Sequence, residues 1–153
     1  MKRQRGMTLV ELIISIVVVG IAASALFSAM ASITARSADP MLRQQALAIA
    51  EAYLEEILTQ PYLDPSTGNE CPSAPGNRAL FDNVCDYNGL NDNGARDSSG
   101  NALAGLSNYR IQVAVANGAA WNGVPAGAVL SVDVTVTDPQ GQALLLRGYR
   151  TRY

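Results

Sequence analysis

The N-terminal part of the chain is one long apolar run. Between Gly6 and Ala35 the only ionisable side chain is Glu11, and residues 12–33 carry no charge. An α-helix rises 1.5 Å per residue, so this uncharged stretch would extend about 33 Å, enough to cross the hydrocarbon core of a bilayer. We therefore expect a membrane-spanning helix over residues 7–35.

The pattern then changes to that of an amphipathic helix over residues 36–60. Asp39 and Pro40 are typical of a new helix start, with the N-cap followed by proline at the first helical position. Pro61 ends the helix near Gln60. One face is apolar, because apolar residues recur at spacings of three and four: Leu42, Ala46, Ile49, Tyr53 and Ile57. Such a face needs a sheet to cover it.

The last third of the chain alternates apolar and polar residues with a period of two. Residues 109–115 and 130–137 show this alternation, and residues 138–141, Asp-Pro-Gln-Gly, are a type I turn signal before a returning strand at 142–153. We expect an antiparallel meander over residues 108–153 with one face against the helix. The predicted fold class is α+β, a long N-terminal helix packed on a C-terminal antiparallel sheet.

Residues 61–107, between helix and sheet, are rich in Pro, Gly, Asn and Asp. A connection of this length is far longer than an ordinary loop, so we expect it to be functional, locally stapled or partly disordered. A second Gly-rich connection, residues 117–127, contains the single tryptophan, Trp121. A lone tryptophan in such a loop more often anchors it on the core, and the alternative is an exposed contact for a ligand or partner.

Composition limits the chemistry. The 153 residues are 48% apolar and 16% charged, against about 25% charged in an average domain. The net charge of −2 argues against nucleic acid as a partner. There is no histidine and Lys2 is the only lysine, so the usual general bases are missing, and two cysteines cannot complete a zinc shell. We expect no enzyme, no catalytic residue and no cofactor.

The charges at the N-terminus predict an orientation. Lys2, Arg3 and Arg5 precede the apolar run and no basic cluster follows it directly, which places the N-terminus in the cytoplasm and the remainder outside. The run is too long for the apolar region of a cleaved secretory signal. Glu11 needs its own explanation, because a carboxylate in a membrane helix costs about 2.5–3.5 kcal/mol and normally has a partner or a role.

The N-terminus resembles the class III leader of type IV prepilins and type II secretion pseudopilins. It has a basic leader at residues 1–6 that ends in Gly6, followed by an apolar helix that starts at Met7 and has Glu11 as its fifth residue. A plain membrane anchor is the alternative. The resemblance implies that prepilin peptidase cleaves between Gly6 and Met7 and methylates the new amine of Met7. It also implies that Glu11 pairs with that amine on a neighbouring subunit and sets the subunit register.

Small residues recur every four positions in the apolar run, at Gly20, Ser24, Ser28 and Ser32. Such a stripe lets helices approach closely in a membrane or a filament core, although small residues also simply dilute an apolar span. Many major pilins carry a proline midway through this helix, and none occurs here before Pro40.

The layout of the head is similar to that of minor pilins. Residues 41–62 and the Asp/Asn/Gly-rich middle are most similar to minor pilins of mannose-sensitive haemagglutinin pili. The implied protein is a minor type IV pilin, anchored in the bacterial inner membrane with a periplasmic head before it enters a filament. Its implied partners are prepilin peptidase, other major and minor pilins, the inner-membrane assembly platform and the lipid bilayer. The alternatives are a minor pseudopilin of a type II secretion system and an adhesin head that uses Trp121, the tyrosines and the Asp/Asn loop.

Two further sites are expected in the middle segment. Outside the cytoplasm Cys71 and Cys85 should form a disulfide, worth about 3 kcal/mol for a loop of this size, with two free thiols as the alternative. The second is a weak calcium candidate formed by oxygen-bearing side chains, namely Asp86, Asn88, Asp92 and Asp97. The EF-hand register fails because Leu90 stands at a ligand position, and turn chemistry accounts for the same residues.

Overall fold

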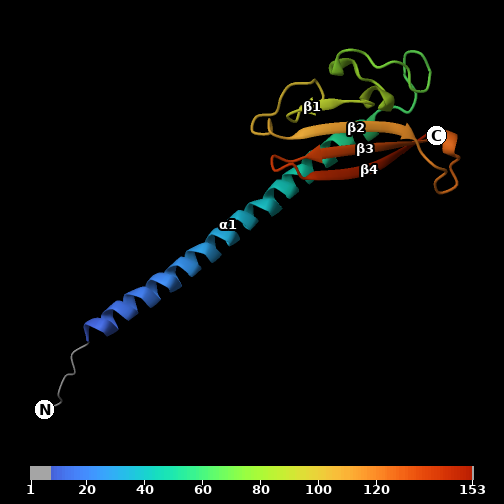
Figure 1. Ribbon diagram of the computed structural model, residues 1–153. Coiled ribbons are helices and arrows are strands. Elements are labelled where there is room, and N and C mark those ends of the chain that lie inside the picture. Colours follow the sequence, from blue (N-terminus) through green and yellow to red (C-terminus); the bar gives the residue numbers. More distant parts are fainter. Residues whose placement is uncertain (1–7, 153) are drawn as a thin grey trace. The chain divides into compact units, whose positions relative to one another are not determined.

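The structure is a computed structural model, and it describes residues 8–152, without the side chains of residues 32–39. The chain divides into two compact units after Met41, within the helix α1 (Leu9–Thr59), which Figure 1 labels. The first unit contributes the N-terminal part of α1. The second, residues 42–153, contains the rest of α1 and a four-stranded sheet. The α+β, pilin-like fold class is confirmed.

Helix α1 begins at Leu9, directly after Thr8, and continues through Pro40. The carbonyl of Thr8 accepts the N–H of Leu12 at 3.1 Å, and at the other end Gln60 donates its N–H to Ile57 at 3.1 Å. The expectation that a new helix starts at Asp39 and Pro40 is wrong, because Pro40 lies inside α1. Proline has a helical φ and lacks only one N–H, so a helix rich in good helix formers on both sides can continue through it at some cost.

The sheet is an antiparallel meander in the order β1 (Asn91–Asn93), β2 (Arg110–Asn117), β3 (Val129–Thr137) and β4 (Ala143–Thr151). The first strand comes from the segment expected to be a connecting loop. That segment also contains the short 3-10 helices η1 (Arg78–Leu80) and η2 (Val84–Tyr87). Alternation could not predict β1, because its three polar residues form a short edge that is held by pairing with β2.

The core of the second unit lies between α1 and one face of the sheet. Inward residues alternate along the central strands, and their helical partners recur at spacings of three and four. The fully or nearly fully buried members from these elements are Ala46, Ala50, Tyr53, Ile57, Ile111, Val113, Leu130, Val132, Val134 and Val136. Strand β4 approaches α1 at Gly148, where an added Cβ would lie 2.9 Å from a methyl carbon of Leu54 and of Leu58. The absence of a side chain there permits this close packing.

Candidate assembly segment and head surface

The first turn of α1 presents Glu11. Thr8 precedes the helix, and its Oγ1 accepts the backbone N–H of Glu11 at 3.3 Å. Thr8 and Glu11 thus have the Thr-x-x-Glu spacing of a capping box, and a carboxylate in the first turn is favoured by the positive end of the helix dipole. This cap was not predicted, although the spacing is visible in the sequence. Gly6 and Met7 lie outside the described residues.

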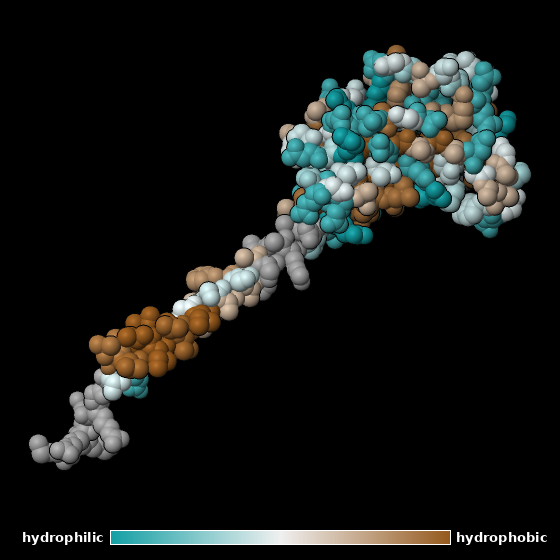
Figure 2. All heavy atoms as spheres, in the orientation of Figure 1, coloured by the Kyte–Doolittle hydropathy of each residue, from teal (hydrophilic) through white to brown (hydrophobic). Residues whose placement is uncertain are grey.

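The segment Leu9–Ala31 is long and apolar enough to span a membrane, and none of it is buried within the chain. Leu9 and Phe27 are 74% and 70% exposed. Figure 2 shows brown, apolar side chains over much of this segment, with paler residues toward its later part. An apolar surface of this extent requires lipid or other protein to cover it.

The stripe of small residues is exposed at Gly20, Ser24 and Ser28. A Cβ added to Gly20 would meet no atom within 4 Å, so another helix has room to approach there. The Oγ of Ser24 donates to the carbonyl of Ile21 at 2.8 Å, so this hydroxyl is satisfied inside the helix. Ser28 is exposed, and the side chain of Ser32 lies outside the described residues.

In the second unit, residues 42–153, here called the head, Arg78 is the centre of a buried charged cluster. Its Nη1 lies 2.6 Å from Oδ2 of Asp92, and its Nη2 lies 3.1 Å from Oε2 of Glu56. Tyr53 donates its hydroxyl to the same Asp92 oxygen at 2.8 Å and accepts the N–H of Arg96 at 2.8 Å. The cluster therefore fastens η1 and β1 to α1.

Aromatic rings complete this cluster. The guanidinium carbon of Arg78 lies 4.8 Å from the ring centroid of Tyr53 and 5.9 Å from that of Tyr87, and Tyr87 donates its hydroxyl to Glu56 at 2.8 Å. Burial raises the pKa of Tyr53 and, together with Glu56, that of Tyr87. Burial alone would lower the pKa of Arg78, but its hydrogen bond to Tyr53 and the charge of Glu56 raise it. Arg78 therefore stays charged.

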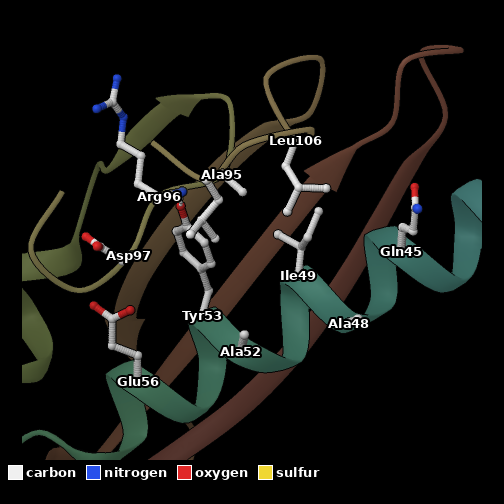
Figure 3. A pocket seen from close by; sticks show the side chains of 11 residues that line it. Gln45, Ala48, Ile49, Ala52, Tyr53, Glu56, Ala95, Arg96, Asp97 and Leu106 are labelled. Atoms are coloured by element: carbon white, nitrogen blue, oxygen red, sulfur yellow. Dashed lines mark hydrogen bonds between the residues drawn. The ribbon is translucent and has the colours of Figure 1, made fainter. Parts of the chain in front are cut away.

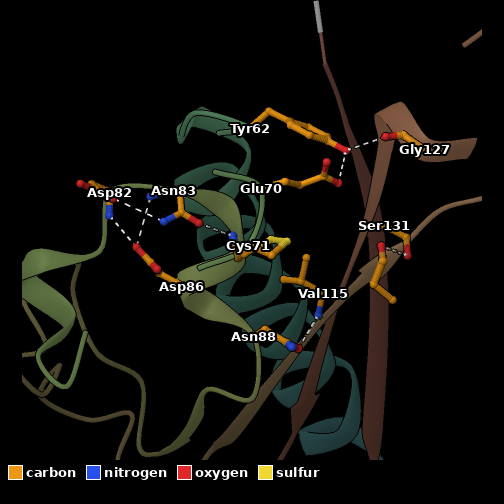
Figure 4. Close-up of a disulfide and its surroundings, with 12 residues drawn as sticks. Tyr62, Glu70, Cys71, Asp82, Asn83, Asp86, Asn88, Val115, Gly127 and Ser131 are labelled. Atoms are coloured by element: carbon orange, nitrogen blue, oxygen red, sulfur yellow. Dashed lines mark hydrogen bonds between the residues drawn. A yellow bond between two sulfur atoms is a disulfide. The ribbon is translucent and has the colours of Figure 1, made fainter. Parts of the chain in front are cut away.

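The predicted disulfide between Cys71 and Cys85 is confirmed (Figure 4). Cys85 lies in η2, which Asn83 caps by accepting the N–H of Cys85 at 2.9 Å. Nearby, Tyr62 donates its hydroxyl to Glu70 at 2.8 Å, beside the disulfide-bonded chain. Burial, with the hydrogen bond to Glu70, raises the pKa of Tyr62 to about 12. The segment that follows α1 is thus stapled rather than loose.

The structure does not bring the calcium candidates together. Asp86 accepts the backbone N–H groups of Asp82 and Asn83, Asn88 accepts the N–H of Val115, Asp92 is paired with Arg78, and Asp97 holds a turn with Asn101. In residues 8–152, as far as they are described, no group of three or more acidic, Cys or His side chains is placed to hold a metal ion. Each of these four side chains instead accepts a hydrogen bond from the protein, although Oδ1 of Asp86 is buried without a partner.

Comparison with protein-family models adds an independent finding at the N-terminus. Residues 1–27 match the family described as the prokaryotic N-terminal methylation motif. At its N-terminus the chain is similar to type IV pilins and pseudopilins. The motif is that of a non-enzymatic structural subunit that is processed by prepilin peptidase and assembles with pilins. No curated protein and no solved structure matches the chain, so the resemblance to mannose-sensitive haemagglutinin pilins receives no support.

The head of this pilin-like protein has an apolar groove between α1 and the loop that follows β1 (Figure 3). Its volume is about 360 Å³. Ile49 and Leu106 point toward each other in it, while the guanidinium of Arg96 points away. Ala48 and Ala52 form its floor on the helix, and Glu56, Arg96 and Asp97 lie at one end. The groove belongs to the helix–loop packing that the Arg78 cluster fixes.

The expectation that Trp121 anchors its loop on the core is wrong. Its side chain is 52% exposed and stacks on Tyr149, with 5.6 Å between ring centroids and 16° between ring planes. Tyr149 belongs to β4 and is itself 42% exposed, so the indole packs on the outer face of the sheet. The core face is already filled by aliphatic side chains and by α1, which leaves no room for an indole there.

Proposed function

We propose that this chain is a minor type IV pilin. Prepilin peptidase would cleave it between Gly6 and Met7 and methylate the amine of Met7, and the product would join a filament. The observation that carries the proposal is the methylation motif over residues 1–27, which extends through most of the uncovered apolar segment Leu9–Ala31. The head, an α1 segment packed on an antiparallel meander, supports the same function.

Glu11 is the residue proposed to set the register. It lies in the exposed first turn of α1, and within the described residues no ion pair involves it. The amine of Met7 on a neighbouring subunit supplies a cation of opposite sign. When both groups leave water inside a bundle of apolar helices, an unpaired Glu11 is costly and a paired one fixes the axial position. Gly20, Ser24, Ser28 and Ser32 would permit close helix contact in the same bundle.

The proposed location is the bacterial inner membrane, with a cytoplasmic N-terminus and a periplasmic head, followed by the filament. The apolar segment Leu9–Ala31 supplies the anchor, and the disulfide between Cys71 and Cys85 fits an oxidising compartment. The proposed partners are prepilin peptidase, other major and minor pilins, the inner-membrane assembly platform and the lipid bilayer.

Intact-mass measurement on the protein isolated from its own membranes tests the proposal. We expect a chain that lacks residues 1–6 and carries one added methyl group on Met7. Gly6→Leu should retain the leader, because a side chain at the scissile bond blocks close approach of the backbone. Gly20→Leu is the matched control and should still be cleaved. An unprocessed wild-type N-terminus in cells with an active prepilin peptidase would reject the proposal.

A minor pseudopilin of a type II secretion system is the second candidate, since the same N-terminal motif serves both assemblies. Deletion of the gene separates the two. Loss of surface pili with normal secretion favours the pilin, whereas loss of protein secretion with intact pili favours the pseudopilin.

A further inference from the structure

The stacked pair Trp121 and Tyr149 is exceptional among the aromatic side chains of the head. Tyr53, Tyr62, Tyr87 and Tyr109 are 6% exposed or less, whereas Trp121 and Tyr149 are 52% and 42% exposed. Exposed aromatic surface forgoes the stabilisation that burial would give, and paired aromatic rings at a surface are typical of contact sites. The pair lies on the face of the sheet away from α1.

A tight turn holds the indole in place. Trp121 and Val124 exchange two backbone hydrogen bonds, of 3.0 and 2.8 Å, across Asn122 and Gly123. Both central residues have positive φ, 48° and 86°, as a two-residue type I′ turn requires. At the base of the loop, Gly118 donates its N–H to Val129 at 2.8 Å. The loop that carries Trp121 is therefore ordered before a ligand binds, which lowers the entropic cost of binding.

A polar floor accompanies the aromatic pair. The Nε and Nη2 atoms of Arg147 lie 2.5 and 2.6 Å from the two carboxylate oxygens of Asp133. The Nη1 atom of Arg147 takes no part in these two bonds. The Arg147 side chain is 52% exposed and that of Asp133 25% exposed, so the pair offers both donors and acceptors to a ligand while its charges cancel.

The aromatic pair and Arg147 line one cavity of about 260 Å³, whereas Asp133 is not among its lining residues and is connected to it through Arg147. Asn117 and Ser131 also line the cavity and add polar groups to those of Trp121, Arg147 and Tyr149. The volume is just below the roughly 300–1,000 Å³ of pockets that hold drug-sized ligands, which fits one small ring rather than a long chain. All the lining residues belong to the second unit, so the site is independent of the N-terminal motif.

We propose that this cavity binds a neutral pyranose sugar. One face of such a ring carries C–H groups that pack on an indole, and its hydroxyls both donate and accept hydrogen bonds, as Arg147, Asn117 and Ser131 require. A purely apolar ligand would leave these polar groups desolvated without partners, and the carboxylate of Asp133 already neutralises Arg147, the cation that an anionic ligand would need. The pilin-like head thereby becomes a sugar-binding surface as well as a filament subunit.

The test uses the fluorescence of Trp121, the only tryptophan in the chain. The full chain, in a zwitterionic detergent without sugar groups, is titrated with the methyl glycosides of glucose, galactose, mannose and N-acetylglucosamine. We expect a saturable change with at least one of them, no change with glycerol and a weaker response to glucuronic acid. No saturable response to any of the four up to about 10 mM, tenfold above a weak Kd of about 1 mM, would overturn the proposal.

Variants locate the binding. Tyr149→Ala and Arg147→Ala should each weaken the affinity at least tenfold, with circular dichroism showing that the sheet is retained. Leu145→Ala is the matched control, because Leu145 lies on the same strand and is 57% exposed but does not line the cavity. Equal affinity in Arg147→Ala and the wild type, or tighter binding of glucuronic acid than of any neutral sugar, would contradict the assigned site.

Discussion

Nη1 of Arg78 lies 2.6 Å from Oδ2 of Asp92, and both residues are only 9% and 7% exposed. This pair joins the segment that follows α1 to the edge strand β1. Because Tyr53 of α1 donates to the same carboxylate oxygen, one buried contact holds a helix, a 3-10 turn and a strand together. The stability of the head should therefore depend strongly on it.

Removing one partner of this pair should be costly. Arg78→Met leaves the buried carboxylate of Asp92 with only the longer 3.7 Å contact to the partly exposed Arg96, and we expect a loss of about 3–5 kcal/mol in the free energy of unfolding. Urea denaturation of the full chain in detergent, followed by circular dichroism, measures it. Arg147→Met removes an exposed ion pair and serves as the control, with an expected loss of at most about 1 kcal/mol. Equal losses in the two variants would refute the special role of the buried cluster.

The disulfide should stabilise the connecting segment. Cys71 and Cys85 are separated by 14 positions, and the chain-entropy model gives about 3 kcal/mol for closing a loop of this size. Replacing both cysteines by serine should lower the free energy of unfolding by about this amount. Reductant should destabilise the wild type to a similar extent and leave the double variant unchanged. Two thiols that react with a labelling reagent in the denatured, unreduced wild type would contradict the bond.

The close contact of α1 with β4 predicts intolerance of a side chain at residue 148. Gly148→Val forces the methyl groups of Leu54 and Leu58 aside, and we expect a loss of about 1–3 kcal/mol from overpacking. Gly76→Val is the control, because a Cβ at Gly76 would meet no atom within 4 Å. Thermal unfolding of both variants measures the difference, and a Gly148 variant as stable as the control would show that α1 can shift freely on the sheet.

The raised pKa of Tyr62 predicts a loss of stability at alkaline pH. Its pKa is raised to about 12 in the folded chain, above an ordinary value of about 10. The folded state therefore holds the proton more tightly, so this contribution to stability is complete below about pH 10 and is lost as the pH rises through about 12. Across this pH window the free energy of unfolding should fall less steeply in Tyr62→Phe than in the wild type. Glu70→Gln should shift the loss toward lower pH, and an unchanged profile in both variants would contradict this assignment.

Glu11 predicts a defect in assembly without a defect in processing. Glu11→Ala should still lose residues 1–6 but should enter filaments poorly, because the amine of Met7 on the neighbouring subunit loses its counter-charge. Quantifying the variant in sheared filaments and in membranes measures this ratio. Glu51→Ala, an exposed carboxylate elsewhere on α1, is the control and should assemble normally. Normal incorporation of Glu11→Ala would refute the register role.

The parts of the fold that depend on local periodicity were predictable from the sequence. The apolar run, the apolar face of α1 and the alternation in β2 and β3 each follow from a pattern along the chain, while Pro61 marks the end of α1 and the turn signal at residues 138–141 precedes β4. The restart expected at Asp39 and Pro40 was wrong because a sequence signal for an N-cap cannot show whether the preceding residues are already helical. The three-residue β1 has no alternation of its own and exists only through pairing with β2.

The same division applies to the sites. By itself the sequence determined the methylation motif, the apolar anchor, Glu11 and the presence of two cysteines, because each depends on residue type and spacing within a short segment. Only the tertiary structure decided that Asp92 pairs with Arg78 rather than sharing a cation, and that Trp121 stacks on Tyr149 outside the core. These contacts join residues that are distant in the chain, and the packing of α1 on one face of the sheet determines which side chains remain for the other face.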